Sequence, residues 1–419
     1  MKVFLGATFL TVMVVGFFLL FRGGEGVVVV SPGLIEEEIV SRPTGTIASQ
    51  SEVVDDPRRD ISPQKPLLNP PANIKAIYLT GWSAGLSSRV ENVKRLAKEG
   101  LINAVVIDVK DYSGYLSYET DIKLAEQVGA HDELRIVRPN ALIKELHDAG
   151  LYVIGRISVF QDPKLASGRP DLALKNQDNT LWRDNKGLAW LDPAAQPVWD
   201  YVIDIGEDAV NRGFDELNYD YIRFPSDGNL EAIVYPYWNE SSSREVVIKN
   251  FFSYLRYSLS DHRISADLFG LVTVRHDDLG IGQVLENALP YFDAVAPMVY
   301  PSHYGAGFLG FKNPAEYPYE VIDNALQISL HRMLKLSASS SNEKQATIRP
   351  WLQDFDLGAD YDEAKVRAQI AAVEKWQKRY PEAVDGWMIW SPSNVYTEKA
   401  LYPKTTTVTN DSTSTVIER

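Results

Sequence analysis

Apolar positions follow two alternating patterns along the middle of the chain. Short runs in which apolar residues are continuous or alternate predict β-strands, and segments with apolar residues every three or four positions predict helices. The predicted strands cover residues 75–80, 102–109, 152–158, 214–225, 264–269, 293–300, 347–352 and 385–390. The predicted helices cover about 88–99, 139–149, 198–212, 244–260, 281–289, 319–336 and 362–379, and a last one follows Ser393.

The patterns make eight strand-then-helix units, and eight such units close a parallel barrel. The segment 102–109 is apolar throughout, which indicates a strand buried on both faces, as in a parallel sheet. We therefore predict an α/β protein with a (β/α)8 TIM barrel over residues 74–403. Pro297 and Pro350 fall inside predicted strands, where proline removes a hydrogen-bond donor, so each marks either a bulge or a misplaced strand.

The N-terminus carries an almost unbroken apolar run at residues 3–21, between Lys2 and Arg22. A helix of roughly 20 such residues spans a bilayer. No Ala-x-Ala-like cleavage site follows the run, so an uncleaved membrane anchor over residues 1–22 is favoured over a cleaved signal peptide. We expect a single-pass protein of the cell membrane with its barrel on the extracytoplasmic side. A secreted protein is the alternative.

Two further segments lack the apolar content of a folded domain. Residues 23–73 are rich in proline and acidic residues, including Pro70 and Pro71. Residues 404–419 are rich in Thr and Ser and show no periodicity. Such segments bury too little apolar surface to offset the entropy of ordering, so we predict a disordered linker and a disordered tail.

Composition excludes several classes of function. The net charge is −14 and the pI is about 5.0, which argues against a nucleic-acid partner because its phosphates would be repelled. There are no cysteines, so disulfides and thiolate chemistry are excluded. The six histidines show no zinc-ligand spacing, and no glycine-rich phosphate loop follows a strand. No cofactor is predicted, although a divalent ion held by Asp108, Asp220 and Asp267 stays open.

The ends of the predicted strands carry the candidate chemistry, because parallel barrels place their active sites where strands run into the following loops. The candidates are Trp82, Asp108, Lys110, Arg156, Asp220, Arg223, Asp267, Tyr300 and Trp390. Carboxylates beside aromatic faces suit a sugar, whose CH groups stack on rings. Two carboxyl groups across a glycosidic bond supply an acid and a base or nucleophile.

Asp220 and Asp267 are the predicted catalytic pair, because they lie on adjacent strands at equivalent depth. We expect Asp108 to be held by Lys110 or Arg156. The three cations, Arg223 included, would orient carboxylates or bind acidic sugar groups. Trp82, Tyr300 and Trp390 would offer stacking faces, and Trp390 could equally plug the barrel mouth.

Two other classes of function stay open at this point. Asp–Arg networks also brace barrel rims without catalysis, so the same rim would suit a non-catalytic glycan-binding or cell-wall scaffold barrel. A carboxylate-bound metal would instead suit an envelope esterase or deacetylase.

Six motifs in order resemble a bacterial family of glycoside-hydrolase-like domains that was long catalogued as uncharacterised. They are YLTGW at 78–82, VIDVKDY at 106–112, GRISVF at 155–160, NYDYIRFP at 218–225, SADLFG at 265–270 and APMVYPSHY at 296–304. The resemblance covers about residues 74–403.

This resemblance implies a TIM barrel related to α-galactosidases and α-amylase-like hydrolases. In those relatives a strand-four Asp is the nucleophile, which corresponds to Asp220. The acid lies on strand five or six, where Asp267 is the only carboxylate at a strand end. Asp267 departs from the Glu that amylase-like enzymes use. The expected function is hydrolysis of a cell-envelope or extracellular polysaccharide.

Overall fold

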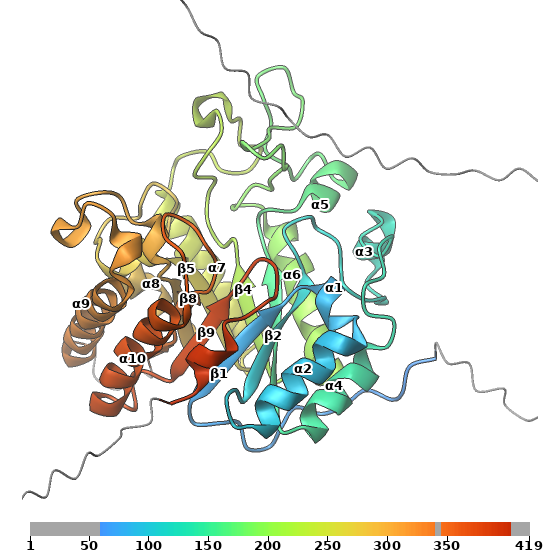
Figure 1. Cartoon of the computed structure of the whole chain (residues 1–419). Helices are drawn as coiled ribbons and strands as arrows, with labels where there is room; N and C mark the ends of the chain where they lie inside the picture. Colours follow the sequence, from blue (N-terminus) through green and yellow to red (C-terminus); the bar gives the residue numbers. More distant parts are fainter. Residues whose placement is uncertain (1–58, 340–344, 404–419) are drawn as a thin grey trace, which may run out of the picture. The chain divides into compact units, whose positions relative to one another are not determined.

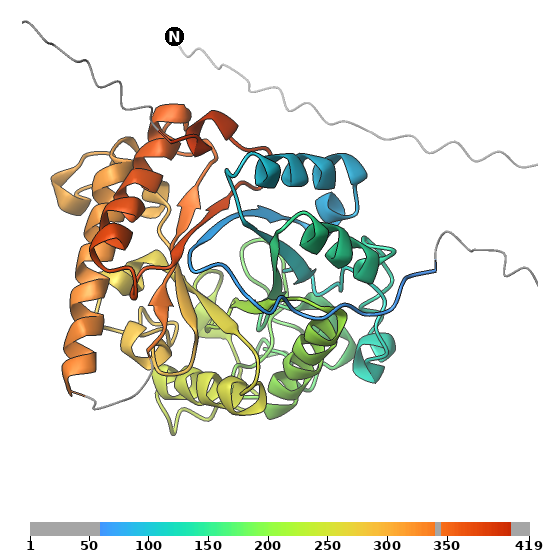
Figure 2. The same cartoon turned by 90° about the horizontal axis from the view of Figure 1, so that it is seen from below.

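One closed parallel sheet forms the centre of the molecule. The computed structural model describes residues 59–339 and 345–403. The strands run in the order β5-β4-β3-β2-β1-β9-β8-β6-β7, and the pairing of β5 with β6 closes the ring, which Figure 2 shows end-on. They are β1 Ile74–Leu79, β2 Ala104–Lys110, β3 Tyr152–Ser158, β4 Glu216–Asp220, β5 Ile264–Phe269, β6 Ala294–Met298, β7 Thr347–Ile348, β8 Trp351–Gln353 and β9 Gly386–Trp390. Because β7 and β8 both pair with β6, they share one position, and the predicted eight-stranded barrel is confirmed.

Two predicted strands differ from the structure for local reasons. Pro350 splits the seventh strand into β7 and β8, since it has no N–H to donate to the sheet. Pro297, by contrast, lies within β6. The prediction that the fourth strand reaches Pro225 is wrong: β4 ends at Asp220, because Tyr221 has a φ of 54° and breaks the extended run.

Helices surround the barrel in the predicted alternation (Figure 1). They are α1 Gly81–Ala84, α2 Ser87–Lys98, α3 Lys123–Gln127, α4 Pro139–Asp148, α5 Pro163–Gly168, α6 Gln196–Arg212, α7 Arg244–Ser258, α8 Leu285–Ala288, α9 Pro318–Ser339 and α10 Glu363–Arg379. Gly213, at φ 114°, ends α6 in a left-handed conformation that leads the chain into β4. The helix expected at 281–289 is shortened to α8, and the last one is a 3-10 turn, Glu398–Leu401.

The side chains of each strand alternate between two packed layers. Outward-facing residues such as Ile77 and Val105 pack against the helices, and inward-facing residues such as Ala76 and Val106 fill the barrel. The inward layer turns polar at the level of Glu216. There the buried Arg349 donates to the Glu216 carboxylate at 2.7 Å.

The chain before β1 crosses the lower end of the barrel (Figure 2). The Asp60 carboxylate accepts hydrogen bonds from the N–H groups of Asn140 and Ala141, in the first turn of α4. Further along, the N–H of Leu67 donates to the Asp215 carboxylate at 2.6 Å. Residues 59–73, expected to belong to the linker, are therefore fixed to the barrel. Asp60 binds there because the start of a helix leaves backbone N–H groups without partners, and an acidic side chain can accept hydrogen bonds from them.

The other predicted terminal segments, 1–22, 23–58 and 404–419, lie outside the described residues. Within the described ranges, none of the helices combines the length and the apolar character needed to cross a bilayer.

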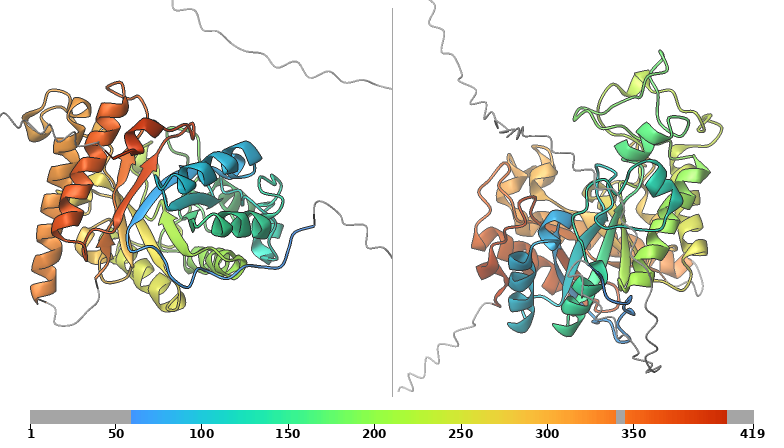
Figure 3. Two further views of the ribbon diagram at one scale, coloured as in Figure 1. Left: turned by 60° about the horizontal axis from the view of Figure 1, so that its bottom comes forward. Right: turned by 90° about the vertical axis from the view of Figure 1, so that its right-hand side faces the viewer.

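Long connections after β3 and β4 form a layer above the upper end of the barrel, visible at the top of Figure 1 and in the right-hand view of Figure 3. The two connections meet where Lys175 pairs with Val234, and the first folds back on itself where Ala173 pairs with Leu191. This layer stands beside the carboxyl ends of the strands and adds a wall to the site there.

Candidate active site

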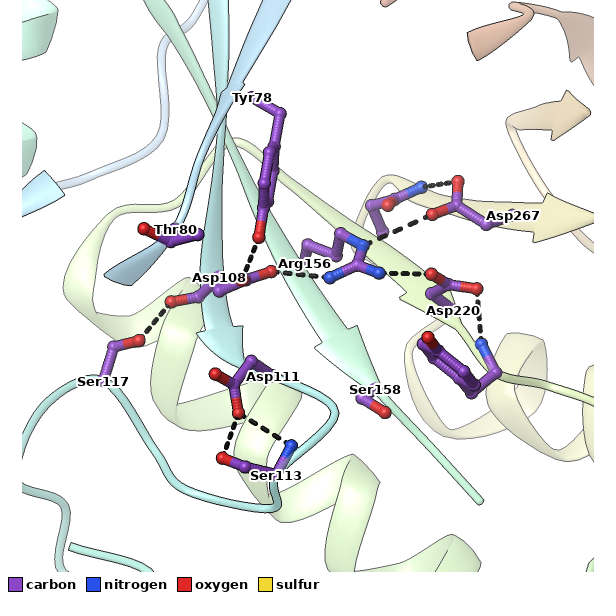
Figure 4. A network of polar contacts seen from close by, with 12 residues as sticks. Tyr78, Thr80, Asp108, Asp111, Ser113, Ser117, Arg156, Ser158, Asp220 and Asp267 are labelled. Atoms are coloured by element: carbon purple, nitrogen blue, oxygen red, sulfur yellow. Dashed lines mark hydrogen bonds and ion pairs between the residues drawn. The ribbon is translucent and has the colours of Figure 1, made fainter. Parts of the chain in front are cut away.

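The guanidinium of Arg156 lies at the centre of three buried carboxyl groups (Figure 4). Its Nη1 donates to Asp108 Oδ1 at 2.7 Å, its Nη2 donates to Asp220 Oδ2, and its Nε lies 3.6 Å from Asp267 Oδ2. Arg156 stands on β3 between the strands that carry these residues. Three carboxyl groups around one cation cannot all ionise cheaply in a buried site, so the cluster must hold protons.

Asp220 is held as an acceptor at both of its oxygens. Oδ2 accepts from Arg156, and Oδ1 accepts from the backbone N–H of Tyr221 at 2.6 Å. The left-handed conformation of Tyr221 turns this N–H toward the carboxyl group. Two donors from different elements therefore fix the orientation of the Asp220 carboxyl group.

Asp267 is surrounded differently, although it lies at the same level. The pairing of Tyr219 with Ala266 puts Asp220 and Asp267 side by side on neighbouring strands. Oδ1 of Asp267 accepts from Asn218 at 2.9 Å and from Trp351 at 2.7 Å. Burial, followed by the charge of the neighbouring carboxylate, raises the pKa of Asp267 to about 8. Because Oδ1 already accepts two hydrogen bonds, the proton belongs on Oδ2.

Asp108 braces Arg156 from the other side. Its Oδ2 accepts from the Tyr78 hydroxyl at 2.5 Å, and Tyr78 stacks on Trp390 with ring centroids 4.0 Å apart. Burial raises the pKa of Asp108 to about 6, although Arg156 and Tyr78 oppose the rise. Asp108 does not line the cavity, so it acts through Arg156.

A cavity with two adjoining parts opens above this cluster. The deep pocket, of about 390 Å3, is bordered by Arg156, Asp220, Asp267, Trp351 and Trp390, and by Gln161 and Lys186 of the upper layer. The side pocket, of about 320 Å3, is bordered by Arg223, Phe269, Leu271 and Tyr304. Asp220, Tyr221, Met298, Tyr300 and His303 border both parts. Each part has the size of a small-molecule site.

The cluster is not arranged as a metal site. The position between its carboxyl groups holds the Arg156 guanidinium. Across residues 59–339 and 345–403, no group of three or more His, Cys, Asp or Glu side chains is placed to hold a metal ion. These side chains therefore do not fit a carboxylate-bound ion while Arg156 stands among them.

A family model described as "Putative glycosyl hydrolase domain" matches residues 76–396. The chain belongs to this family. The match spans every strand of the barrel except the first two residues of β1 and includes all of the carboxyl groups around Arg156. Among curated proteins there is no significant match.

Three solved structures are similar to this chain to different degrees. A hypothetical protein from Ruminiclostridium thermocellum is 36% identical over 49% of this chain and 98% of its own length, with a TM-score of 0.42. The α-L-fucosidase isoenzyme 2 of Paenibacillus thiaminolyticus is 13% identical, with a TM-score of 0.50, 78% of this chain covered and 48% of the fucosidase. The α-galactosidase TtGalA of Thermus thermophilus is 14% identical, with a TM-score of 0.46 and coverages of 80% and 61%. The likeness to the fucosidase shows a shared fold.

The structure brings together most of the residues expected at the site. Asp108, Arg156, Asp220 and Asp267 form the cluster, and Arg223, Tyr300 and Trp390 border the cavity. Arg156, and not Lys110, holds Asp108.

Two expected substrate-binding residues lie away from the cavity. Lys110 is fully buried and donates to Asp162 at 2.6 Å, where it supports the start of α5. Trp82 is 55% exposed on α1 and packs against Arg135, 5.3 Å from its ring. The structure thus gives Lys110 a structural partner and leaves Trp82 on the rim.

Other residues of the site were not among the predicted binding residues. Tyr78 and Asn218 bind the carboxyl groups of the cluster, and Trp351 does so from β8. Tyr78 and Asn218 stand in the recognised motifs, and inward alternation along β1 and β4 could have pointed to them. His303, whose pKa burial lowers, borders both parts of the cavity.

The proton on Asp267 predicts a pH-dependent stability. Because the folded-state pKa is raised, the folded protein holds a proton that the unfolded chain releases above about pH 4. Between about pH 4 and 8, the stability of the wild type relative to Asp267→Asn is expected to fall by about 1.4 kcal/mol per pH unit. Urea unfolding of both proteins at several pH values measures this difference.

Asp148→Asn is the matched control, since Asp148 is exposed on α4 and pairs with Lys144. Its stability relative to the wild type should stay level over the same pH range. Parallel curves for the wild type and Asp267→Asn would show that Asp267 is ionised in the folded protein.

Proposed function

We propose that this barrel hydrolyses glycosidic bonds in a cell-envelope or extracellular polysaccharide. One observation carries the proposal: Asp220, which accepts hydrogen bonds at both oxygens, and Asp267, whose pKa burial raises to about 8, border the same pocket on neighbouring strands. Glycoside hydrolysis needs such a pair, one carboxylic acid and one carboxylate, on the two sides of the scissile bond. Membership of the glycosyl hydrolase domain family supports the same reading.

The proposed reaction begins with proton transfer from Asp267 Oδ2 to the glycosidic oxygen. The bond between that oxygen and the anomeric carbon breaks, and the leaving sugar departs with the proton. Asp220 either bonds to the anomeric carbon, to be displaced later by water, or takes a proton from an attacking water. Arg156 keeps Asp220 oriented while Asp267 donates its proton.

The pocket walls would bind the sugar itself. Trp390 and Tyr300 present ring faces for CH groups, and Gln161 from the upper layer offers an amide whose Oε1 has no hydrogen-bond partner among the described residues. We propose further that residues 3–21 anchor the protein in the cell membrane with the barrel outside, a secreted form being the alternative.

Turnover of the full-length protein on a panel of bacterial envelope and secreted polysaccharides tests this function. Release of new reducing ends by the wild type and by Asp148→Asn is the expected result. The contact of Arg156 with both carboxyl groups favours one rival, a glycan-binding barrel that does not cleave. Binding without cleavage of any glycan would replace the proposal by that rival.

A further inference from the structure

Arg223 is a nearly buried cation that forms no ion pair with any carboxylate in the described part of the chain. Its side chain borders the side pocket, and the residue is only 7% exposed. Nη1 donates to the carbonyl of Phe224 and to Ser226 Oγ, both at 3.1 Å. Across the described ranges, no Asp or Glu lies within ion-pair distance of Arg223, and Nε and Nη2 have no hydrogen-bond acceptor. Arginine is almost never buried in this way unless it is paired.

Aromatic rings hold the guanidinium in place without neutralising it. Its central carbon lies 4.7 Å from the ring centres of Trp190 and Phe269 and 5.5 Å from that of Tyr221. Ring faces attract the cation, but they leave the N–H groups in its plane without acceptors. Burial lowers the pKa of Arg223, although the charges of Tyr221, Asp220, Asp227 and Asp184 oppose the fall, so these groups offset only part of the cost of burying the cation. The protein therefore keeps a costly cation beside Asp220.

The cavity as a whole carries more cations than ionised carboxyl groups. Arg156, Arg223 and the exposed Lys186 border it, against the carboxyl groups of Asp220 and the protonated Asp267, while Asp108 lies behind Arg156 and offsets part of its charge. Such a surplus inside a chain of net charge −14 is a local attraction for anions.

We propose that Arg223 forms an anion subsite beside the cleavage position, so that the substrate is an acidic glycan. The shared chemistry is a planar or tetrahedral oxyanion on a sugar: a uronic-acid carboxylate, a sulfate ester or a phosphate ester. The free Nε and Nη2 form one edge of the guanidinium, which binds two oxygens of such a group at once. This inference rests on the proposed function, since the side pocket shares Asp220 with the deep pocket.

Binding of single sugars tests the subsite without any turnover. Calorimetry of the full-length protein would compare galacturonate, galactose 6-sulfate and galactose 6-phosphate with galactose, which separates the three sources of the anion. The wild type is expected to bind at least one acidic sugar about 10- to 100-fold more tightly than galactose, and increasingly weakly as salt rises. Equal binding of acidic and neutral sugars, or no binding of acidic ones, overturns the subsite.

Three variants locate the preference at Arg223. Arg223→Gln is expected to lose it and Arg223→Lys to keep part of it, because an ammonium keeps the charge but not the paired N–H groups. Lys186→Gln, an exposed change, should weaken it only a few-fold. Arg379→Gln, on the outer face of α10, is the matched control and should bind like the wild type. A preference that survives in folded Arg223→Gln rejects the proposal. If Arg223→Gln does not fold, an unchanged preference in Arg223→Lys does so.

Turnover separates this inference from the proposed function. Cleavage rates would be compared between acidic glycans and their neutral counterparts, for example polygalacturonate and its carboxyl-reduced form. If acidic sugars bind through Arg223 and no glycan is cleaved, the subsite stands and the hydrolase falls. If neutral glycans are cleaved as well as their acidic counterparts, the hydrolase stands and the subsite falls.

Discussion

Asp220→Asn is expected to abolish turnover, with a loss of at least about 10³-fold in kcat, while the barrel stays folded. The reason is chemical: the amide cannot bond to an anomeric carbon or accept a proton from water. It would also present N–H groups where Arg156 and the N–H of Tyr221 now donate. Steady-state release of reducing ends, with thermal unfolding of each variant alongside, measures the effect.

Asp108→Asn separates chemistry from the loss of a partner for Arg156. Asp108 contacts the same guanidinium and is also buried, but it does not border the cavity. A much smaller loss in Asp108→Asn than in Asp220→Asn is therefore expected. Equal losses would mean that Asp220 only positions Arg156, and retained turnover in Asp220→Asn would remove it from the reaction.

The architecture could be predicted because its signals are local. Period-two and helical patterns alternate eight times, and a closed barrel is the arrangement that buries them. Inward alternation also placed Asp220 and Asp267 at one level, as the register of β4 and β5 confirms. The limits of single strands depended on backbone detail, such as the left-handed Tyr221, that the pattern does not contain.

The sequence does not show which cation pairs with which carboxyl group in the cluster. Lys110 and Arg156 both lie near the carboxyl ends of their strands, yet Lys110 pairs with Asp162 whereas Arg156 contacts three carboxyl groups. The difference arises because an inward position on β3 points into the barrel, whereas a register shift between Asp108 and Lys110 displaces the latter. The unpaired state of Arg223 likewise depends on where every carboxylate lies.

Asp267→Asn is expected to lower turnover of the polysaccharide by about 10²- to 10⁴-fold, the usual contribution of a general acid. The loss should shrink on an aryl glycoside of the same sugar, because a good leaving group departs without a proton. In the wild type, kcat/KM should fall as the pH rises through about 8, since the acid of the free enzyme is active only while Asp267 is protonated. This alkaline limb should be absent from Asp267→Asn.

The dependence of the loss on the leaving group and the pH profile together distinguish a general acid from a residue with only a structural role. If the Asp267 carboxyl group only held Asn218 and Trp351 in place, its replacement would lower turnover of both substrates alike. It would also leave the alkaline limb unchanged in the variant. Equal losses on the two substrates, or wild-type activity that rises through pH 8, would contradict the assignment. A leaving-group-dependent loss cannot come from misplaced neighbours, because they are the same for both substrates, and it would therefore place the transferred proton on Asp267.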